Sequence, residues 1–265
     1  MIAVQTGEPV LKVLQWNTLA DQLATDFPRA NVEALQWEQR QGLLIAELES
    51  SEADLLVLEE VDHYEDWFLP SLQRLGYEGR FQRKAGWHRD GTAVFYRPDK
   101  VRVDTCEAVI YPEQSQFFLL LQCVLLPATP FVLAATHLKA KAAFEDCRVA
   151  EIQHLLTSLQ SFAALPMLLV GDFNSIPTGQ VYAAVSASGL RSVYCDALRV
   201  GEPEFTSLKY RDKLQCYTID YIWQRGWKTL AVWSLPTEEE IGHQGLPCTA
   251  YPSDHLALLC HLSLA

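Results

Sequence analysis

Stretches of apolar residues that end abruptly in acidic, amide or imidazole side chains recur along this sequence. A single aspartate after a buried strand is most often a turn former or a helix cap. Six such places in one chain instead indicate strands whose ends meet at one rim of a sheet, where polar groups can gather into a site. They lie at Trp16-Asn17, Glu59-Glu60, Thr136-His137, Gly171-Asp172-Phe173-Asn174, Asp220 and Ser253-Asp254-His255.

The apolar segments predict many strands and few helices. Strands are expected over residues 11–16, 54–61, 77–82, 92–96, 101–109, 117–126, 131–136, 167–170, 218–223, 229–233 and 256–262. Helices are expected from Asn31 through Trp37, Leu44 and Leu48, in a short segment ending at Leu75-Gly76, and over residues 144–162 and 181–185. This pattern favours an α/β protein with two packed sheets and outer helices. Nothing between residues 11 and 264 has the composition of a linker, so we expect residues 1–265 to form a single domain.

The charge balance narrows the choice of partner. With 33 acidic and 21 basic residues the formal net charge is −12, whereas binding to a long phosphate backbone needs clustered Lys and Arg. The balance therefore favours a small anionic substrate. The seven cysteines form no C-x-x-C pair, which argues against a zinc site and a disulfide framework.

No secretion signal or membrane span is predicted. The longest apolar stretch, residues 117–135, is interrupted by Gln122, Pro127 and Pro130 and is expected to form two strands around a turn. We therefore expect a cytoplasmic monomer without membrane contact, although an upstream mitochondrial targeting segment stays an open alternative.

The polar strand ends suit metal-assisted chemistry. Asp172 and Asn174 are two residues apart and project to the same side of an extended segment, and Glu60 adds a carboxylate from another strand. Such oxygen ligands suit Mg²⁺ or Mn²⁺. His137 and His255 can bind or protonate a phosphoryl oxygen. Together these residue types predict metal-assisted hydrolysis of a phosphoester.

The basic residues near these segments have two readings. Lys84, Lys139, Lys141 and Arg148 are either part of a solvated face, the usual place for such side chains, or an anion clamp within an acidic protein. Neither a G-x-x-x-x-G-K-[ST] loop nor a G-x-G-x-x-G loop is present to cradle phosphates instead.

Several motifs, in this order, resemble the endonuclease/exonuclease/phosphatase superfamily, within the branch that includes the carbon-catabolite-repressor-type deadenylases. G-D-F-N and S-D-H are common to the superfamily, whereas E-V-D-H-Y, T-H-L-K-A and Y-P-S-D-H are narrower. The matching stretches are residues 13–20, 58–64, 72–77, 136–140, 171–174, 219–223 and 251–256. The resemblance implies a two-sheet α/β sandwich and a Mg²⁺-dependent phosphoesterase.

The resemblance also implies roles around a metal ion. Glu60 would be the main metal ligand, with Asn17 beside it and Asp254 in the same metal site. Asp172 would activate or orient the attacking water, and Asn174 would hold the phosphate.

Further implied roles concern the substrate. His255, oriented by Asp220, would contact the scissile phosphate, and His137 would be another phosphate contact. Some members of this branch remove the 2′-phosphate from NADP(H), with basic residues matching Lys84 and Lys141 gripping the dinucleotide, and others shorten poly(A) tails. Hydrolysis of NADP(H) is the first hypothesis and 3′-to-5′ exoribonuclease activity on RNA the alternative. A catalytically inactive binding module is a third reading, disfavoured because the acidic, amide and histidine residues are all present.

Four features depart from the pattern of this branch. Glu59 stands where glutamine is usual, Lys141 replaces an arginine, Tyr217 replaces a histidine, and the segment 83–91 is shorter. By strand alternation Glu59 should point away from Glu60, so we expect it to be tolerated.

Overall fold

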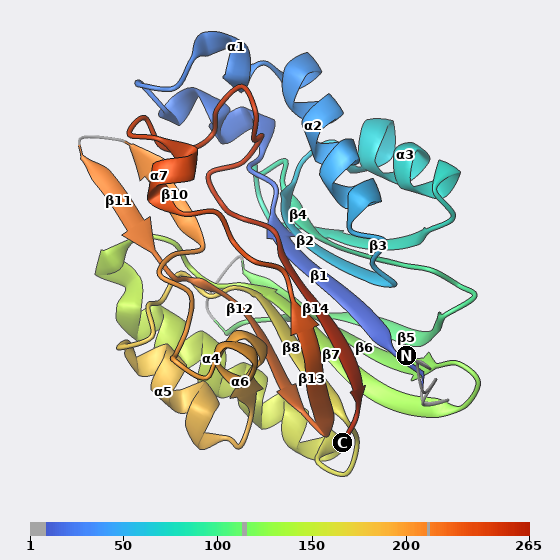
Figure 1. Cartoon of the computed structure of the whole chain (residues 1–265). Helices are drawn as coiled ribbons and strands as arrows, with labels where there is room; N and C mark the ends of the chain where they lie inside the picture. The colour runs from blue at the N-terminus through green and yellow to red at the C-terminus, as the bar shows by residue number, and fades with distance from the viewer. Residues whose placement is uncertain (1–8, 113–115, 211–212) are drawn as a thin grey trace, which may run out of the picture.

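Two six-stranded sheets form the centre of the molecule (Figure 1). The structure is a computed structural model that describes residues 9–112, 116–210 and 213–265. The first sheet has the order β13 (Trp227–Val232), β14 (Leu258–Leu264), β1 (Leu11–Asn17), β2 (Leu55–Val61), β4 (Gly91–Tyr96) and β3 (Glu78–Arg83). The second has the order β5 (Val101–Ile110), β6 (Phe117–Leu125), β7 (Thr129–His137), β8 (Met167–Asp172), β12 (Asp220–Arg225) and β9 (Arg191–Ser192). A separate hairpin pairs β10 (Ser207–Tyr210) with β11 (Leu214–Tyr217).

Helices cover the outer faces of both sheets (Figure 1). On the first sheet lie α2 (Trp37–Ser50) and α3 (Leu69–Arg74), and on the second α4 (Glu145–Leu159) and α5 (Gln180–Ala187). The short α1 (Val32–Leu35) lies beyond the strand ends and packs against residues 19–30 and α2. The short α6 (Val193–Leu198) contacts β12 of one sheet and β13 of the other, and α7 (Glu238–Ile241) precedes β14. In the described ranges no helix combines the length and apolarity that crossing a membrane requires.

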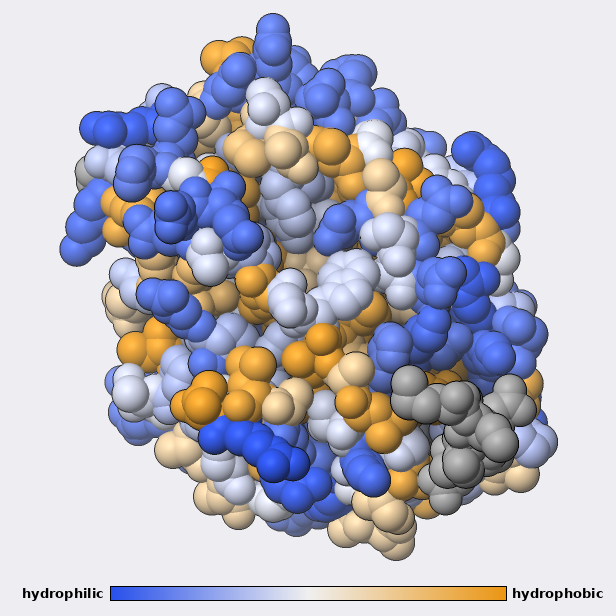
Figure 2. All heavy atoms as spheres, in the orientation of Figure 1, coloured by the Kyte–Doolittle hydropathy of each residue, from blue (hydrophilic) through white to orange (hydrophobic). Residues whose placement is uncertain are grey.

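Three apolar layers hold this arrangement together. Alternate residues such as Val13, Val57 and Leu133 pack between the sheets, where burial of apolar side chains is the main stabilising contribution. Leu44 and its neighbours fill the layer under α2, and Ile152 and its neighbours fill the layer under α4. The surface in Figure 2 is mostly hydrophilic, with hydrophobic residues scattered in small groups. The predicted two-sheet α/β sandwich with outer helices is confirmed.

Local differences from the sequence expectations have identifiable causes. Asn31 caps a helix as expected, but that helix, α1, ends at Leu35 because Gln36 adopts an extended backbone, and α2 begins at Trp37. The strands β9, β10 and β11 and the helices α6 and α7 were not expected, since each is at most six residues long and has too short a pattern to detect.

Strand pairing gathers the polar strand ends at one edge. β1 is parallel to β2, and β7 is parallel to β8, so each pair ends on the same side. In register, Asn17 lies opposite Glu59, and His137 lies opposite Asp172. Antiparallel β12 begins where β8 ends, which places Asp220 opposite Asp172. Segments far apart in the sequence therefore meet at this edge.

The close approach of β7 and β8 depends on Gly171. Its φ is +147°, and a Cβ atom added there would lie 1.8 Å from the backbone oxygen of Thr136. Only glycine fits this contact, which sets Asp172 beside His137.

Replacing Gly171 by alanine is expected to lower the free energy of unfolding by about 3 kcal/mol, because the strands must separate to admit the methyl group. Gly189→Ala is the matched control: Gly189 also has positive φ, +85°, but its Cβ would meet no atom within 4 Å. That control should lose only about 1 kcal/mol. Urea unfolding of both variants measures the difference, and equal losses would show that the contact with Thr136 is unimportant.

Candidate active site

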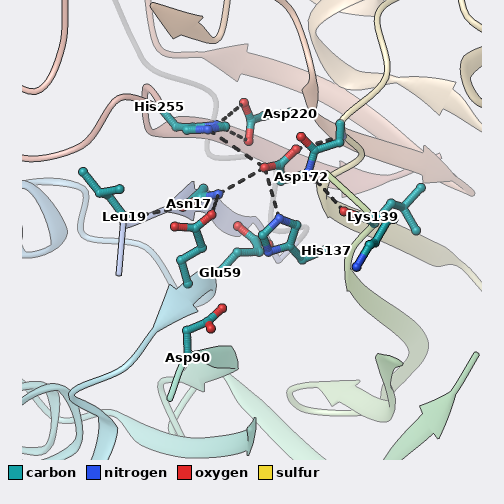
Figure 3. A network of polar contacts seen from close by, with 12 residues as sticks. Asn17, Leu19, Glu59, Asp90, His137, Lys139, Asp172, Asp220 and His255 are labelled. Atoms are coloured by element: carbon teal, nitrogen blue, oxygen red, sulfur yellow. Dashed lines mark hydrogen bonds and ion pairs between the residues drawn. The ribbon is translucent and has the colours of Figure 1, made fainter. Parts of the chain in front are cut away.

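A row of three ionisable side chains crosses the second sheet at its polar edge (Figure 3). His137 Nε2 lies 3.6 Å from Asp172 Oδ2, and Asp172 is paired in register with Asp220. All three side chains are buried. The row follows directly from the register of β7, β8 and β12.

His255 completes a hydrogen-bonded pair with Asp220. Its Nδ1 lies 2.9 Å from Asp220 Oδ2, and the same carboxylate accepts hydrogen bonds from Thr206 Oγ1 at 2.6 Å and Gln15 Nε2 at 3.1 Å. The other ring nitrogen, Nε2, lies 4.0 Å from Asp172 Oδ2. With Nδ1 held by Asp220, the imidazole presents Nε2 to the centre of the site, and the orienting role of Asp220 stays a prediction.

The first sheet contributes Asn17 and Glu60. The Asn17 Nδ2 amide donates to Glu60 Oε1 and to Asp172 Oδ2, each at 3.1 Å, so a single amide group bridges the two sheets. The backbone N–H of Ala20 donates to Glu60 Oε2 at 3.2 Å. Glu60 has a φ of +55°, and the pairing of β2 with β4 slips between Leu58 and Val61, so Glu60 leaves the regular alternation of its strand.

Glu59 lies in the interior beneath the site and is fully buried. Gln15 Nε2 donates to its Oε2 at 2.9 Å as well as to Asp220. Burial, reinforced by the charges of Asp220 and Asp172, raises the pKa of Glu59 well above its ordinary value. A protonated glutamic acid has nearly the shape of glutamine, the residue that the sequence resemblance leads one to expect there.

The segment that carries Asp254 and His255 is fastened to β1. Ser253 Oγ donates to the Asn17 backbone oxygen at 2.6 Å, and Trp16 Nε1 donates to the His255 backbone oxygen at 2.7 Å. We call this junction between residues 252–255 and residues 16–19 the seam. Arg40 of α2 is fully buried and contacts both of its segments. Its Nε donates to Pro252 O at 2.8 Å, and its Nη2 donates to the backbone oxygens of residues 18 and 19.

Lys209 and Thr206 belong to the site but were missed in the sequence. Lys209 Nζ donates to Asp254 Oδ2 at 2.8 Å, and Thr206 binds Asp220 as described. Both residues lie in or beside the short β10 strand. Its four residues show no apolar pattern from which a strand could be predicted. They reach the site because Leu208 N bonds Asp254 O and Leu256 N bonds Thr206 O across the chain.

Burial and neighbouring charges shift the pKa values of His137, Asp172 and His255 differently, so the two histidines have different charges. Burial, with the nearby Lys84 charge, lowers the pKa of His137 well below its ordinary value, so this ring is neutral. Burial and the Asp220 charge raise the pKa of Asp172 to about 7. Burial alone would lower the pKa of His255, but the Asp220 and Asp254 carboxylates raise it to about 10, so the ring carries a positive charge at neutral pH.

The predicted phosphate-binding residues are distributed around this centre. Lys84 Nζ lies 2.5 Å from Asp90 Oδ2 and 3.4 Å from His137 Nδ1. Asn174 donates its backbone N–H to Asp172 Oδ1 at 2.8 Å and its Nδ2 to Leu138 O at 3.1 Å, with a φ of +48°.

The other basic residues lie on the loop after β7, which carries Lys139 and Lys141, and on the first turn of α4, which carries Arg148. Lys141 is exposed, and Lys139 Nζ lies 5.4 Å from the centroid of the Phe144 ring. Arg148 is buried instead: it binds Glu145 Oε2 at 2.6 Å and donates to the backbone oxygens of Lys139 and Lys141, each at 2.8 Å. These contacts make Arg148 a support for the loop, and substrate binding by this side chain stays a prediction.

One group in the described residues has the composition of a metal site. The ligand atoms of Asp172, Asp220 and His255 all lie within 4.8 Å of one another, and all three residues are buried. Buried carboxylates and an imidazole at such distances could hold a divalent cation, or orient and deprotonate a water molecule.

The comparisons with known proteins agree with this fold and site. The chain belongs to the Endonuclease/Exonuclease/phosphatase family, whose sequence profile matches residues 14–255. Within that family the chain is similar to nocturnin. It is 37% identical to the proteins of Xenopus laevis and Homo sapiens, over 95% and 96% of this chain and 72% and 65% of theirs.

Two solved structures resemble the whole of the described fold. The human nocturnin catalytic domain with bound sulfate has a TM-score of 0.80 and 32% identity, covering 97% of this chain and 96% of that one. ANGEL2, described as a 2′,3′-cyclic phosphatase and solved with adenosine-2′,3′-vanadate, has a TM-score of 0.89 and 25% identity, covering 98% and 97%. The expected resemblance is therefore confirmed and narrowed to nocturnin-like enzymes.

Proposed function

We propose that this protein is a Mg²⁺-dependent phosphoesterase that removes the 2′-phosphate of NADP⁺ or NADPH, giving NAD⁺ or NADH. The observation that supports it most is the convergence of Asn17, Glu60, Asp172 and the Asp220–His255 pair on one buried centre. This is the residue set that the resemblance to nocturnin assigns to metal, water and phosphate.

The side chains at the centre suit a magnesium ion. Carboxylate oxygens of Glu60 and Asp172 both lie 3.1 Å from Asn17 Nδ2, so two anionic oxygens converge on one small region. Burial, followed by the Asp220 charge, raises the pKa of Asp172, and a cation bound beside this carboxylate would lower it again. Carboxylate oxygens of Glu60 and Asp254 would hold the ion. Asn17 would join them through its amide oxygen Oδ1, which accepts a hydrogen bond from Leu19 N in this structure, and Mn²⁺ suits the same oxygens. The bound ion would polarise a phosphoryl oxygen as a Lewis acid.

The remaining residues would divide the work of hydrolysis. Asp172 lies at the centre, with its Oδ2 3.6 Å from His137 Nε2 and 4.0 Å from His255 Nε2, and would orient the attacking water and accept its proton. The positively charged His255 donates from Nε2 to a phosphoryl oxygen, and Asp220 keeps the ring in place. Asn174 and the neutral His137 bind further oxygens of the phosphate. The water oxygen forms the new bond to phosphorus, the bond from phosphorus to the ribose 2′-oxygen breaks, and the 2′-oxygen takes up the proton that Asp172 accepted. Inorganic phosphate leaves with the oxygen of the water.

The surroundings favour a small nucleotide. Two lysines lie near the centre. Lys84 contacts His137, and Lys209 donates a hydrogen bond to Asp254. A net charge of −12 opposes a long phosphate backbone elsewhere on the surface. ANGEL2, solved with an adenosine derivative, places nucleotide phosphate chemistry on a similar fold.

Phosphate release from NADPH in the presence of Mg²⁺ is the direct test, with a labelled poly(A) strand assayed in parallel. We expect NADPH to be hydrolysed and the RNA to stay intact, with activity lost in EDTA and restored by added Mg²⁺. Shortening of the RNA without hydrolysis of NADPH would contradict the proposal and favour the exoribonuclease alternative.

Lys141→Ala is expected to raise KM for NADPH by about fivefold with little change in kcat, because an exposed cation binds substrate and transition state alike. Lys228→Ala serves as the control, since Lys228 is also exposed but pairs with Ser263 near the far end of β14. Steady-state kinetics distinguish the two variants. An unchanged KM in Lys141→Ala would remove this residue from the substrate site.

A further inference from the structure

The segment between β3 and β4 carries a tryptophan that no part of the chemistry above uses. Trp87 is 83% exposed, the highest exposure of any aromatic side chain in the described residues. Its ring stacks on His88, with 4.4 Å between centroids and 20° between planes. One contact thus orients the ring while most of its surface stays open to solvent. A single exposed apolar side chain is common on protein surfaces, so the residues around Trp87 decide whether its ring is suited to a ligand.

This segment is basic within an acidic protein. Arg83 and Arg89 flank Trp87 and are exposed, and Lys84 lies between them at the site. An exposed aromatic ring among cations is the arrangement that binds a nucleotide, because the cations attract phosphates while the ring stacks on a base.

A continuous series of contacts links Trp87 to the catalytic centre. His88 Nδ1 lies 3.8 Å from Asp90 Oδ1, and Asp90 binds Lys84, which lies 3.4 Å from His137 Nδ1. His137 in turn contacts Asp172. The ends of the segment are also fixed, since Lys84 N donates to Asp90 O at 3.0 Å. Trp87 therefore projects from a short loop closed directly beside the phosphate-binding residues.

We propose that Trp87 is a stacking subsite for a planar heteroaromatic ring of the nucleotide whose phosphate is cleaved at Asp172. This inference rests on the proposed function and adds a specificity-determining residue to it. The loop would bind the ring through Trp87 and the phosphate through Lys84. It offers one tryptophan platform, whereas a strand of RNA needs a succession of platforms, so a dinucleotide is favoured.

The test compares the wild type with Trp87→Ala, Trp87→Phe and a control, Val200→Ala, which removes an equally exposed apolar side chain at 90% exposure. We expect Trp87→Ala to raise KM for NADPH about tenfold, and Trp87→Phe to stay within about threefold of wild type, because a phenyl ring still stacks. Inhibition by inorganic phosphate, which has no ring, should be the same in all four proteins. Quenching of tryptophan fluorescence by NADP⁺ in EDTA should weaken in Trp87→Ala alone among the alanine variants.

The outcomes separate this inference from the proposed function. Hydrolysis of NADPH with the same KM and the same quenching in wild type and Trp87→Ala would overturn the stacking subsite and leave the phosphatase activity standing. If the wild type does not hydrolyse NADPH, the proposed function fails. Quenching of tryptophan fluorescence then shows whether Trp87 stacks on a ring. Loss of quenching by NADP⁺ or by oligo(A) in Trp87→Ala then supports ring stacking, and unchanged quenching by both overturns it.

Discussion

Replacing Glu60 by alanine is expected to reduce Mg²⁺-dependent turnover on the order of 10³-fold, because the several kcal/mol of charge stabilisation from a correctly held metal ion would be lost. The side chain is half-buried at a polar edge, and its contacts are the amide of Asn17 and the N–H of Ala20. The fold should therefore persist, with circular dichroism and the melting temperature close to those of wild type.

Glu59→Gln is the matched control for that experiment, since it changes the adjacent carboxylate without changing its shape. Glu59 faces Gln15 in the interior, and glutamine can accept the same hydrogen bond. We expect this variant to retain turnover. If Glu60→Ala kept Mg²⁺-dependent activity, Glu60 would be removed from the metal site, and the Asp172–Asp220–His255 group would become the place to look.

Replacing Arg40 by leucine is expected to lower the free energy of unfolding by about 3–5 kcal/mol, because three backbone oxygens would lose their buried charged donor. Nearby carboxylates such as Asp21 would lose a compensating charge as well. Activity should fall too, since the seam that Arg40 fastens carries Asn17 on one side and Asp254 on the other.

Urea unfolding of Arg40→Leu and Arg40→Lys measures this effect. Lysine has the charge but not the planar fork that reaches both segments, so it should rescue little of the loss. Arg102→Leu is the control, because Arg102 pairs with the exposed Asp104 on the surface, and such a pair should contribute little to stability. Equal free energies of unfolding for Arg40→Leu and wild type would show that the Arg40 hydrogen bonds are not needed to keep the two segments of the seam together.

Much of the fold could be predicted from the sequence because the core strands are long and apolar. β1 and β8 appear where the residue pattern places them, and each ends in the polar residues that define the site. The convergence of Asn17, Asp172 and Asp220 could also be expected, since strand ends of this type share an edge.

The rest depends on contacts that a linear pattern does not contain. Lys209 lies in a four-residue strand, and its role appears only when β10 reaches Asp254. Arg148 has the charge of a phosphate ligand but is buried behind its loop, because the carbonyl groups of Lys139 and Lys141 need donors there. Glu60 departs from strand alternation through a left-handed backbone, which residue type alone does not reveal.

The central position of β1 has a consequence for biosynthesis. β1 (residues 11–17) lies between β2 and β14 (residues 258–264), so one of its edges stays without a partner until the ribosome has made nearly 250 further residues. An open apolar edge of this kind invites pairing with other chains, so the nascent protein is open to aggregation until β14 is made. His255 and Asp254 also arrive with that late segment. On the proposed mechanism, the chain therefore cannot acquire catalytic activity before residues 254 and 255 have been made and β14 has paired with β1.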